Sequence, residues 1–267
     1  MGRGTEDDAM LKYTGIDGEL VDRVGTAINL IREHEPEEGY YLAFSGGKDS
    51  TVIYDLVIKS GVKFDAHFHM TTVDPDEVRV FIRDNYTDVI WERPKKSMFQ
   101  LIEKHGMLPT RIIRYCCREL KELGGVGRII VTGVRWEESV KRSKRGVFER
   151  SHVKKSTWFL HPIIDWSTSD VWDYIHRNNL KHCSLYDEGK TRIGCIMCPM
   201  QGTKGMLRDK ERFPKYYRAY LRAIGRMLKK AKENGHVWKH GTTPEEVMFW
   251  WIHNADMDTE TKQEQLR

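Results

Sequence analysis

The sequence contains no apolar run long enough to cross a bilayer, and its polar first segment, Met1–Tyr13, lacks the apolar stretch of a secretory signal peptide. It also contains no internal repeat and no low-complexity linker. We therefore expect a cytoplasmic, globular protein without a membrane partner. Its 267 residues suffice for one large α/β domain or for one domain with appendages.

Cysteine is scarce, with five residues in the whole chain. In a reducing compartment, such cysteines are expected to act as ligands or reactive thiols rather than as disulfides. The formal net charge of +5 suits an anionic ligand. Because 39 acidic residues are also present, this charge does not by itself predict nucleic-acid binding.

The sequence lacks a Walker phosphate loop, although it contains a glycine turn between an apolar run and a helical pattern. Leu42 stands where the Walker pattern needs glycine, and Asp49 stands where it needs serine or threonine. The pattern over Tyr40–Asp55 predicts a strand, a turn and a helix. Such a turn directs backbone N–H groups and the positive end of the helix dipole at one point, where a phosphate fits. The predicted phosphate-binding residues are Ser45, Gly46, Gly47, Lys48, Asp49 and Ser50.

Beyond this turn, apolar runs alternate with helical patterns, which predicts an α/β fold with a doubly wound, mostly parallel sheet and helices on both faces. The further strands are expected at Phe64–Met70, Val89–Trp91, Arg128–Val134 and Trp158–Ile164. Helices are expected at Asp17–Glu33, Ser97–His105, Ser167–Arg177, Pro214–Lys232 and Pro244–Asn254, with an aperiodic loop over His182–Gly205. We predict a nucleotide-binding domain over residues 1–180 and a helical C-terminal region over residues 181–267 that packs on it.

Ligands of such sheets bind beyond the carboxyl ends of the strands. Three strand ends, at Ser45–Ser50, Thr71–Asp74 and Gly133–Arg135, are therefore predicted to converge on one site. The contacts expected from the second and third loops are Thr72, Gly133 and Arg135.

Four cysteines form two close pairs, Cys116–Cys117 and Cys195–Cys198. Four thiolates can hold a zinc ion or a [4Fe–4S] cluster. Structural zinc sites usually draw both pairs from Cys-x-x-Cys-like knuckles, which two adjacent cysteines cannot form, although adjacent cysteines can reach two corners of a larger cluster. The spacing favours a cluster, and it leaves zinc and a metal-free site as alternatives.

These motifs resemble those of known families. The sequence SGGKDS is similar to the pyrophosphate loop (PP-loop) of the adenine-nucleotide α-hydrolase superfamily, which includes adenylating ligases, thiolation enzymes and sulfonucleotide reductases. Arg114–Cys117 and Gly194–Pro199 resemble the cluster motif of the iron–sulfur phosphoadenosine phosphosulfate (PAPS) reductase family. The likeness spans about Tyr40–Met200 and includes Gly133–Ser139, His161–Trp172 and Leu185–Gly189.

The resemblance implies a [4Fe–4S] cluster beside an adenine nucleotide. Its ligands would be Cys116, Cys117, Cys195 and Cys198. The loop Ser45–Ser50 would hold a phosphate or sulfate, and Arg135 would add charge-assisted contacts to it.

One departure from the reductases concerns the attacking thiol. Reductases of this family use a cysteine in a C-terminal Cys-Gly-Leu-His tail, whereas this sequence has no cysteine after Cys198. The remaining thiol is Cys183, whose pKa His182 or Lys181 could lower. We predict Cys183 as a sulfur carrier or attacking thiol, with a half-buried structural residue as the alternative.

Basic residues supply two further predictions. The run Lys141–Arg145 follows the Arg135 loop, and Arg142 is predicted to contact the nucleotide. Within Pro214–Lys232, six cations recur at helical spacing opposite an apolar stripe. This face is either solvated or able to follow a nucleic-acid backbone.

Three functions are compatible with these features. The first is ATP pyrophosphatase or adenylating sulfur transfer to a nucleic acid or small molecule, with Lys48 as a catalytic residue, Mg²⁺ on the phosphates and Cys183 or the cluster delivering sulfur. The second is adenosine phosphosulfate (APS) or PAPS reduction with release of sulfite. The third is a non-enzymatic, redox-sensing nucleotide binder. A donor protein of the thioredoxin or cysteine desulfurase type is expected for either enzyme, and the sequence does not predict the oligomeric state.

Overall fold

The structure is a computed structural model that describes residues 12–14 and 20–254. The chain divides into two compact units. The sheet unit comprises Met1–Phe68, Asp76–Glu92 and Gly124–Ile193, and the helical unit comprises His69–Pro75, Arg93–Leu123 and Gly194–Arg267. The predicted domain boundary after residue 180 stays a prediction.

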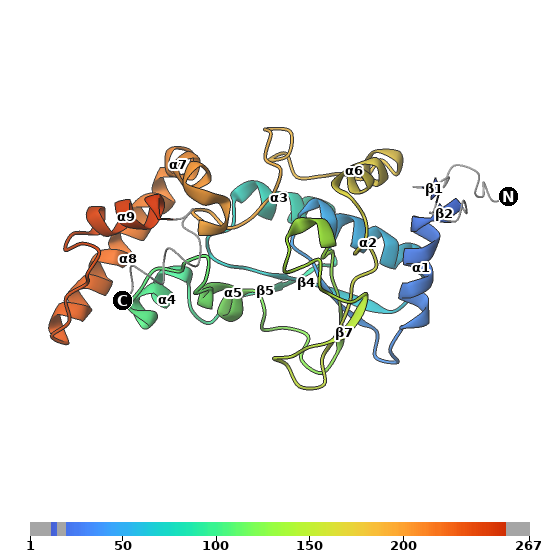
Figure 1. Cartoon of the computed structure of the whole chain (residues 1–267), viewed down its shortest axis with the longest axis horizontal. Helices are drawn as coiled ribbons and strands as arrows, with labels where there is room; N and C mark the ends of the chain where they lie inside the picture. The colour runs from blue at the N-terminus through green and yellow to red at the C-terminus, as the bar shows by residue number, and fades with distance from the viewer. Residues whose placement is uncertain (1–11, 15–19, 255–267) are drawn as a thin grey trace. The chain divides into compact units, whose positions relative to one another are not determined.

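The sheet unit contains a six-stranded sheet in the order β5-β4-β3-β6-β8-β7, of which β4, β5 and β7 are labelled in Figure 1. β3 is parallel to β4 and β6, β6 is parallel to β8, and β7 is antiparallel to β8. The strands are β3 (Tyr40–Ala43), β4 (Phe64–His69), β5 (Ile90–Glu92), β6 (Ile129–Val131), β7 (Phe148–Arg150) and β8 (Trp158–Leu160). A further hairpin pairs β1 (Lys12–Thr14) with β2 (Leu20–Asp22).

The strand order reverses at β3, because the chain first adds β4 and β5 on one side and later adds β6 and β8 on the other. This reversal is the topological switch point, beside which open α/β sheets bind ligands. The loops after β3 and β6 meet at this point. The predicted doubly wound, mostly parallel α/β fold is therefore confirmed, and so is the presence of C-terminal helices.

Helix α2 is central to the sheet unit, since α1 and α6 both pack against it. Leu56 and Val57 of α2 are fully buried, as expected for the apolar face of an amphipathic helix. The helices of this unit are α1 (Arg23–Glu33), α2 (Lys48–Ser60), α3 (Asp76–Asn85), the 3₁₀ turn η1 (Trp136–Glu138) and α6 (Thr168–Arg177). The predicted start of the first helix at Asp17 lies outside the described residues, and Leu20–Asp22 form β2 instead.

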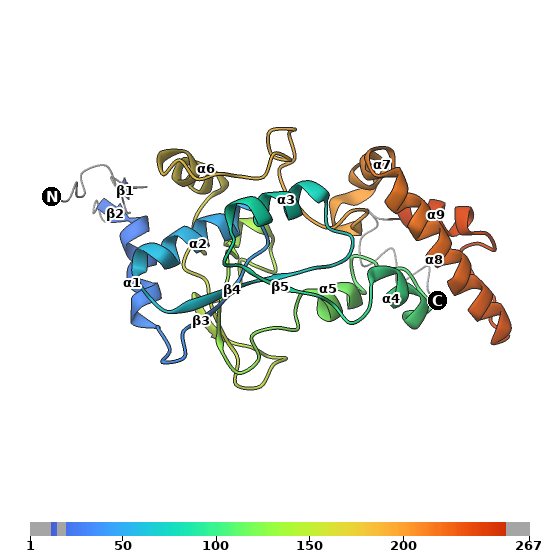
Figure 2. The same cartoon turned by 180° about the vertical axis from the view of Figure 1, so that it is seen from behind.

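The helical unit combines C-terminal helices with two helices from the middle of the chain (Figure 2). Its elements are α4 (Met98–His105), α5 (Tyr115–Leu120), the 3₁₀ turn η2 (Pro199–Gln201), α7 (Gly202–Arg212), α8 (Pro214–Glu233) and α9 (Pro244–His253). α8 packs against α4, α7 and α9. Ile196 and Met197, which lie between two cysteines, belong to the same apolar core. In the described part of the chain, no helix has the length and apolar character needed to span a membrane.

His161 follows β8 and gives the sheet unit a pH-dependent stability. Its side chain is fully buried, and its Nδ1 lies 2.7 Å from Thr132 Oγ1. Burial, aided by the positive charge of Arg145, lowers the pKa of His161 to about 4. The unfolded chain, in which histidine has a pKa near 6.5, therefore binds more protons between these two values.

We expect the free energy of unfolding to fall by up to about 3 kcal/mol from this histidine as the pH drops from about 6.5 to about 4. Urea denaturation at a series of pH values measures this loss. His161→Gln should flatten the curve, whereas His152→Gln, which changes an exposed histidine, should leave it unchanged. Equal curves for His161→Gln and the unmodified protein would contradict the prediction.

Candidate functional site

The glycine turn after β3 has the geometry of an anion-binding loop. Gly46 has a φ of 69°, and a Cβ at this position would lie only 3.0 Å from Ile82 side-chain atoms. Both features require glycine. Gly47 is the N-cap of α2, so the first backbone N–H groups of that helix point out of its end.

Side chains of the loop stabilise this turn. The hydroxyl of Ser50 donates to the carbonyl of Gly47 at 2.8 Å and accepts the backbone N–H of Ser45 at 3.2 Å. The hydroxyl oxygens of Ser45 and Ser50 lie 3.1 Å apart. Ser45 and Ser50 therefore hold the loop in shape, and their predicted phosphate contacts remain predictions.

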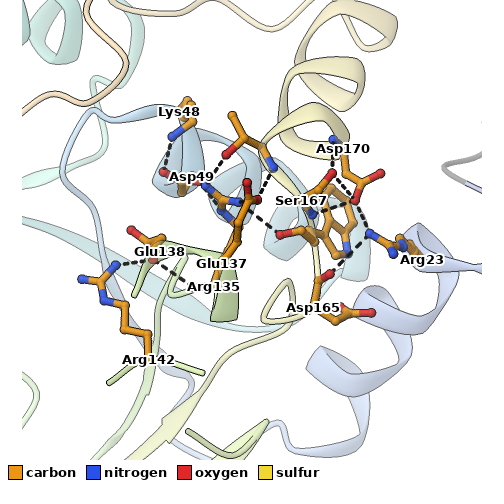
Figure 3. A network of polar contacts seen from close by, with 12 residues as sticks. Arg23, Lys48, Asp49, Arg135, Glu137, Glu138, Arg142, Asp165, Ser167 and Asp170 are labelled. Atoms are coloured by element: carbon orange, nitrogen blue, oxygen red, sulfur yellow. Dashed lines mark hydrogen bonds and ion pairs between the residues drawn. The ribbon is translucent and has the colours of Figure 1, made fainter. Parts of the chain in front are cut away.

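Lys48 and Asp49 form an ion pair at the start of α2, which Figure 3 shows. Lys48 Nζ lies 3.0 Å from Asp49 Oδ2, and the lysine is 6% exposed. The other oxygen of Asp49 accepts a 2.7 Å hydrogen bond from Nε of Arg135. One carboxylate thus links the loop lysine to an arginine of the loop after β6.

Arg135 is almost completely buried, and its guanidinium is surrounded by acceptors (Figure 3). Besides Asp49, it donates to Glu137, to the backbone carbonyl of Trp166 and to the hydroxyl of Thr168, at 3.0, 3.1 and 3.2 Å. Thr168 begins α6, so this arginine ties the phosphate loop to the helix after β8. In this arrangement Arg135 positions Asp49, and a direct contact with phosphate stays a prediction.

The structure brings Gly133 to the loop as well. A Cβ on Gly133 would lie 2.8–2.9 Å from the backbone and Cβ of Asp49, so glycine allows the two loops to touch. Arg142 forms an ion pair with Glu138, whose carboxylate also accepts the backbone N–H of Arg135 at 2.9 Å. Its predicted nucleotide contact is not tested by these interactions.

Tyr186 is a loop contact that the sequence did not single out as a site residue. Its hydroxyl accepts the backbone N–H of Lys48 at 2.9 Å, and its ring lies against Trp172, with the centroids 5.1 Å apart. Only its place in the Leu185–Gly189 motif could have indicated this role. Tyr186 joins the second half of the sheet unit to the phosphate loop.

Cys183 lies three residues before this tyrosine and is fully buried. Burial raises the pKa of its thiol, and the nearby carboxylates of Glu77 and Glu188 act in the same direction. His182, expected to lower that pKa, instead lies 2.9 Å from the carboxylate of Asp187. The expected lowering is therefore wrong, and the catalytic role of Cys183 stays a prediction.

The paired cysteines belong to the helical unit. Cys116 and Cys117 lie in the first turn of α5, and Cys195 and Cys198 lie in the loop before η2. The N–H of Cys198 donates to the carbonyl of Cys195 at 3.2 Å, so the second pair closes a tight turn. All four thiols are partly buried.

A strand-end segment of the helical unit supports this cysteine loop. The backbone N–H of Ile196 donates to the carbonyl of Val73 at 2.8 Å, and Cys195 Sγ lies 3.5 Å from the hydroxyl of Thr71. Thr72 adopts a φ of 66°, and its hydroxyl accepts the N–H of Met98. The predicted nucleotide contact of Thr72 remains a prediction.

The four thiols influence one another electrostatically. The Cys116 thiol donates to Cys117, which lowers the pKa of Cys117 and raises that of Cys116. Arg114 Nη2 lies 3.4 Å from Cys117 Sγ and favours its thiolate. The Cys195 thiolate in turn raises the pKa of Lys121. These two cations offset part of the negative charge that thiolate ligands would bring.

The arrangement of these four thiols can be compared with the ligand geometry that a zinc ion or a [4Fe–4S] cluster needs. Among the described residues, no three His, Cys, Asp or Glu side chains converge as one metal ion would require. A structural zinc needs four donors at about 2.0–2.3 Å from one point. A [4Fe–4S] cluster takes each thiolate on a different iron, so its ligands need not converge on a single ion. Ligation of a [4Fe–4S] cluster by these four thiols therefore stays a prediction.

Asp209 of α7 stabilises the Cys195–Cys198 loop by a hydrogen bond to its backbone. Its carboxylate is 2% exposed and accepts the backbone N–H of Met197 at 2.8 Å and the side-chain amide of Gln201 at 2.5 Å. Met197 has a φ of 61°, a conformation that non-glycine residues rarely adopt. The hydrogen bond that the Met197 N–H donates to Asp209 stabilises this conformation.

We expect Asp209→Ala to lower the free energy of unfolding by about 2 kcal/mol, because the buried N–H of Met197 and the side-chain amide of Gln201 lose their acceptor. Asp209→Asn retains one oxygen acceptor and should lose about half as much. Urea denaturation of the full chain measures both values. Glu211→Ala, on the exposed side of α7, is the matched control and should change stability by less than about 0.5 kcal/mol. Identical unfolding curves for Asp209→Ala and Glu211→Ala would contradict the prediction.

Comparisons with known proteins agree with these motifs. Residues 39–201, more than half of the chain, match the phosphoadenosine phosphosulfate reductase domain family. The adenosine 5′-phosphosulfate reductase of Oceanobacillus iheyensis is 32% identical over 170 residues, which cover 60% of this chain and 70% of that enzyme. An uncharacterized protein of Methanocaldococcus jannaschii is 31% identical over 69% of this chain and 47% of its own length.

The chain thus spans about half the length of the curated relatives from M. jannaschii that it matches. Among solved structures, the PAPS reductase of Candida auris in complex with phosphate aligns with a TM-score of 0.49 at 21% identity, covering 64% of this chain and 88% of that one. On the family match and the bacterial reductase, the chain belongs to the phosphoadenosine phosphosulfate reductase domain family.

Proposed function

We propose that this protein is a PP-loop enzyme that cleaves ATP between its α- and β-phosphates and adenylates an acceptor for sulfur transfer. An oxygen of the acceptor attacks the α-phosphorus, the bond from that phosphorus to the bridging oxygen breaks, and pyrophosphate leaves. The terminal sulfur of a donor protein's persulfide, such as that of a cysteine desulfurase, then displaces AMP and forms an acceptor–S–S–donor disulfide. A dithiol reduces this disulfide, which releases the thiolated acceptor and the donor cysteine and leaves the dithiol oxidised. The adenine nucleotide and the sulfur-donor protein are the partners in this proposal, and we propose a cytoplasmic location for the reaction.

The observation that supports this proposal most is the burial of Cys183. Reduction of a sulfonucleotide needs a thiolate that attacks sulfur. If the paired cysteines are ligands, Cys183 is the one other thiol of the chain, and burial raises its pKa. Adenylation does not require such a thiolate at the phosphate loop.

In the proposed reaction, Lys48 and the first N–H groups of α2 stabilise the negative charge that grows on pyrophosphate as it leaves. Asp49 orients Lys48, and Arg135 orients Asp49 through the contacts at 2.7–3.0 Å. Mg²⁺ bridging the phosphates would lower their charge further. Gly46 and Gly47 let the triphosphate approach the backbone.

Cys116, Cys117, Cys195 and Cys198 would hold a [4Fe–4S] cluster in the helical unit. Such a cluster supplies electron transfer or a site for sulfur when it is bound. Arg114 and Lys121 would balance the charge of its thiolate ligands.

The second candidate is APS or PAPS reduction, with thioredoxin as the electron donor. The similarity to the adenosine 5′-phosphosulfate reductase of O. iheyensis favours it. The two reactions release different products, so one assay separates them.

Anaerobically purified protein is incubated with ATP alone, or with ³⁵S-labelled APS or PAPS and a dithiol, and pyrophosphate and sulfite are measured. With ATP alone, water takes the place of the acceptor oxygen and AMP is the other product, so we expect pyrophosphate from ATP and no labelled sulfite. Lys48→Ala should abolish pyrophosphate release, and Cys183→Ser should not affect it. If the protein releases sulfite and Cys183→Ser abolishes that release, the protein is a reductase instead. If Lys48→Ala leaves turnover unchanged, both proposed reactions are contradicted.

A further inference from the structure

The two units differ strongly in charge. Counted over the sequence, the helical unit contains 22 Lys and Arg against 13 Asp and Glu, whereas the sheet unit contains 22 against 26. The excess of positive charge of the whole chain therefore lies in the helical unit. The helical unit is basic, whereas the sheet unit is slightly acidic. This difference favours a polyanionic partner for the helical unit.

The excess is concentrated on one face of α8. This helix has a single acidic residue, Glu233 at its end. Its opposite face is buried through Tyr220, Ala223, Ile224 and Met227 against α4 and α9, which lie alongside it (Figure 2). The exposed cations of this face are Lys215, Arg218, Arg222, Arg226, Lys229 and Lys230, and Lys232 is a further exposed cation near the end of the helix.

Among the described residues, the N-terminal half of this row is not neutralised by ion pairs. Arg226 pairs with Glu103, and Lys229 reaches Glu233 at 4.0 Å. Within residues 12–14 and 20–254, no acidic side chain pairs with Lys215, Arg218 or Arg222. At 1.5 Å per residue, the row from Lys215 to Lys229 is about 21 Å long, which matches about six successive phosphates of one strand at about 3.4 Å.

We propose that this face of α8, the α8 cation row, binds the phosphate backbone of a nucleic acid, which serves as the acceptor in the proposed sulfur transfer. The choice of acceptor rests on the proposed function, whereas the binding surface rests on the charges themselves. A membrane fits this face poorly, because the apolar side of α8 is already buried in the core.

The aromatic residues at the start of α8 indicate how the nucleic acid is recognised. Lys210 lies over the ring of Tyr217 at 5.1 Å, and Arg212 lies over the ring of Phe213 at 5.4 Å. These ring faces are covered by cations, so they do not offer open platforms for base stacking. We therefore expect binding through phosphates, with little dependence on base sequence and strong dependence on salt.

The test measures fluorescence anisotropy of a labelled tRNA transcript and of a labelled 20-base-pair DNA duplex with the full chain at several salt concentrations. Arg218→Gln/Arg222→Gln removes two adjacent charges of the row. Each lost phosphate contact lowers the slope of log K against log salt by about 0.7–0.9. We thus expect the slope to fall by about 1.4–1.8 and the affinity to fall several-fold, for whichever nucleic acid the unmodified protein binds.

The matched control, Lys63→Gln/Arg83→Gln, removes two exposed charges from the sheet unit and should leave the slope unchanged. Equal weakening by both double variants, absence of binding at low salt, or equally tight binding of poly-L-glutamate or of phosphatidylserine vesicles would overturn the proposal. Pyrophosphate release from ATP without acceptor is measured in parallel. Because the α8 variants should retain it, failure of the surface is distinguishable from failure of the proposed reaction.

Discussion

Arg135→Met is expected to lower the free energy of unfolding by about 3 kcal/mol, since it leaves a carboxylate without its buried partner. Arg135 is 2% exposed, and the side chain of Asp49 is 22% exposed. The substitution keeps most of the volume of the side chain and removes its donors to Asp49, Glu137 and Thr168. Urea denaturation of the full chain measures the loss.

A double-mutant cycle separates the ion pair from general damage. Asp49→Asn/Arg135→Met removes both charges, and we expect it to be less destabilised than the sum of the two single variants by about 1–3 kcal/mol. The matched control is Arg226→Met, which breaks the exposed pair with Glu103 and should change stability by less than about 1 kcal/mol. Additive single effects would show that Arg135 and Asp49 do not interact energetically.

A second substitution, Arg135→Lys, tests the positioning role of Arg135. If this arginine acts through Asp49 and Lys48, Arg135→Lys keeps the charge but loses the forked geometry, so it should weaken nucleotide binding while the protein stays folded. The change would appear as a higher KM for ATP with a smaller change in kcat. An unchanged KM with lost stability would mean that Arg135 has a purely structural role.

The local parts of this site could be predicted from the sequence because they depend on neighbouring residues. A buried strand, two glycines and an apolar helical pattern specify the turn before α2 without reference to the rest of the fold. The contacts of Arg135 are different, since they join residues 86 and 31 positions apart. A single sequence contains no signal for such pairings, so Arg135 was assigned to the ligand rather than to Asp49.

The burial of particular side chains explains two other differences between the sequence predictions and the structure. The predicted loop His182–Gly205 overlaps the first turn of α7, whose buried face consists of Gly202, Gly205, Met206 and Asp209, a set without hydrophobic periodicity. Cys183 has polar neighbours in sequence, yet the fold encloses it completely. The helical unit likewise takes α4 and α5 from the middle of the chain, which a linear reading of domains could not indicate.

Replacing one of the four paired cysteines should strongly lower the iron content of the reconstituted protein. After anaerobic reconstitution with iron and sulfide, we expect about four irons in each unmodified chain if the proposed [4Fe–4S] cluster forms. Cys195→Ser should lose most of this iron and the associated visible absorbance, because a serine hydroxyl is a harder and far less acidic ligand than a thiol. Cys183→Ser is the matched control, and it should retain the iron of the unmodified protein.

The expected loss extends to the fold of the helical unit, since the residues between Cys195 and Cys198 belong to its core. Removing a bound centre removes its contribution to folding, so Cys195→Ser should also unfold at a lower urea concentration than the reconstituted protein. Without reconstitution, the two proteins should differ much less. Colourless protein with one zinc per chain would exclude the cluster, and equal iron in Cys195→Ser and Cys183→Ser would exclude these thiols as its ligands. Either result would leave the phosphate loop and its arginine network as the functional centre of the chain.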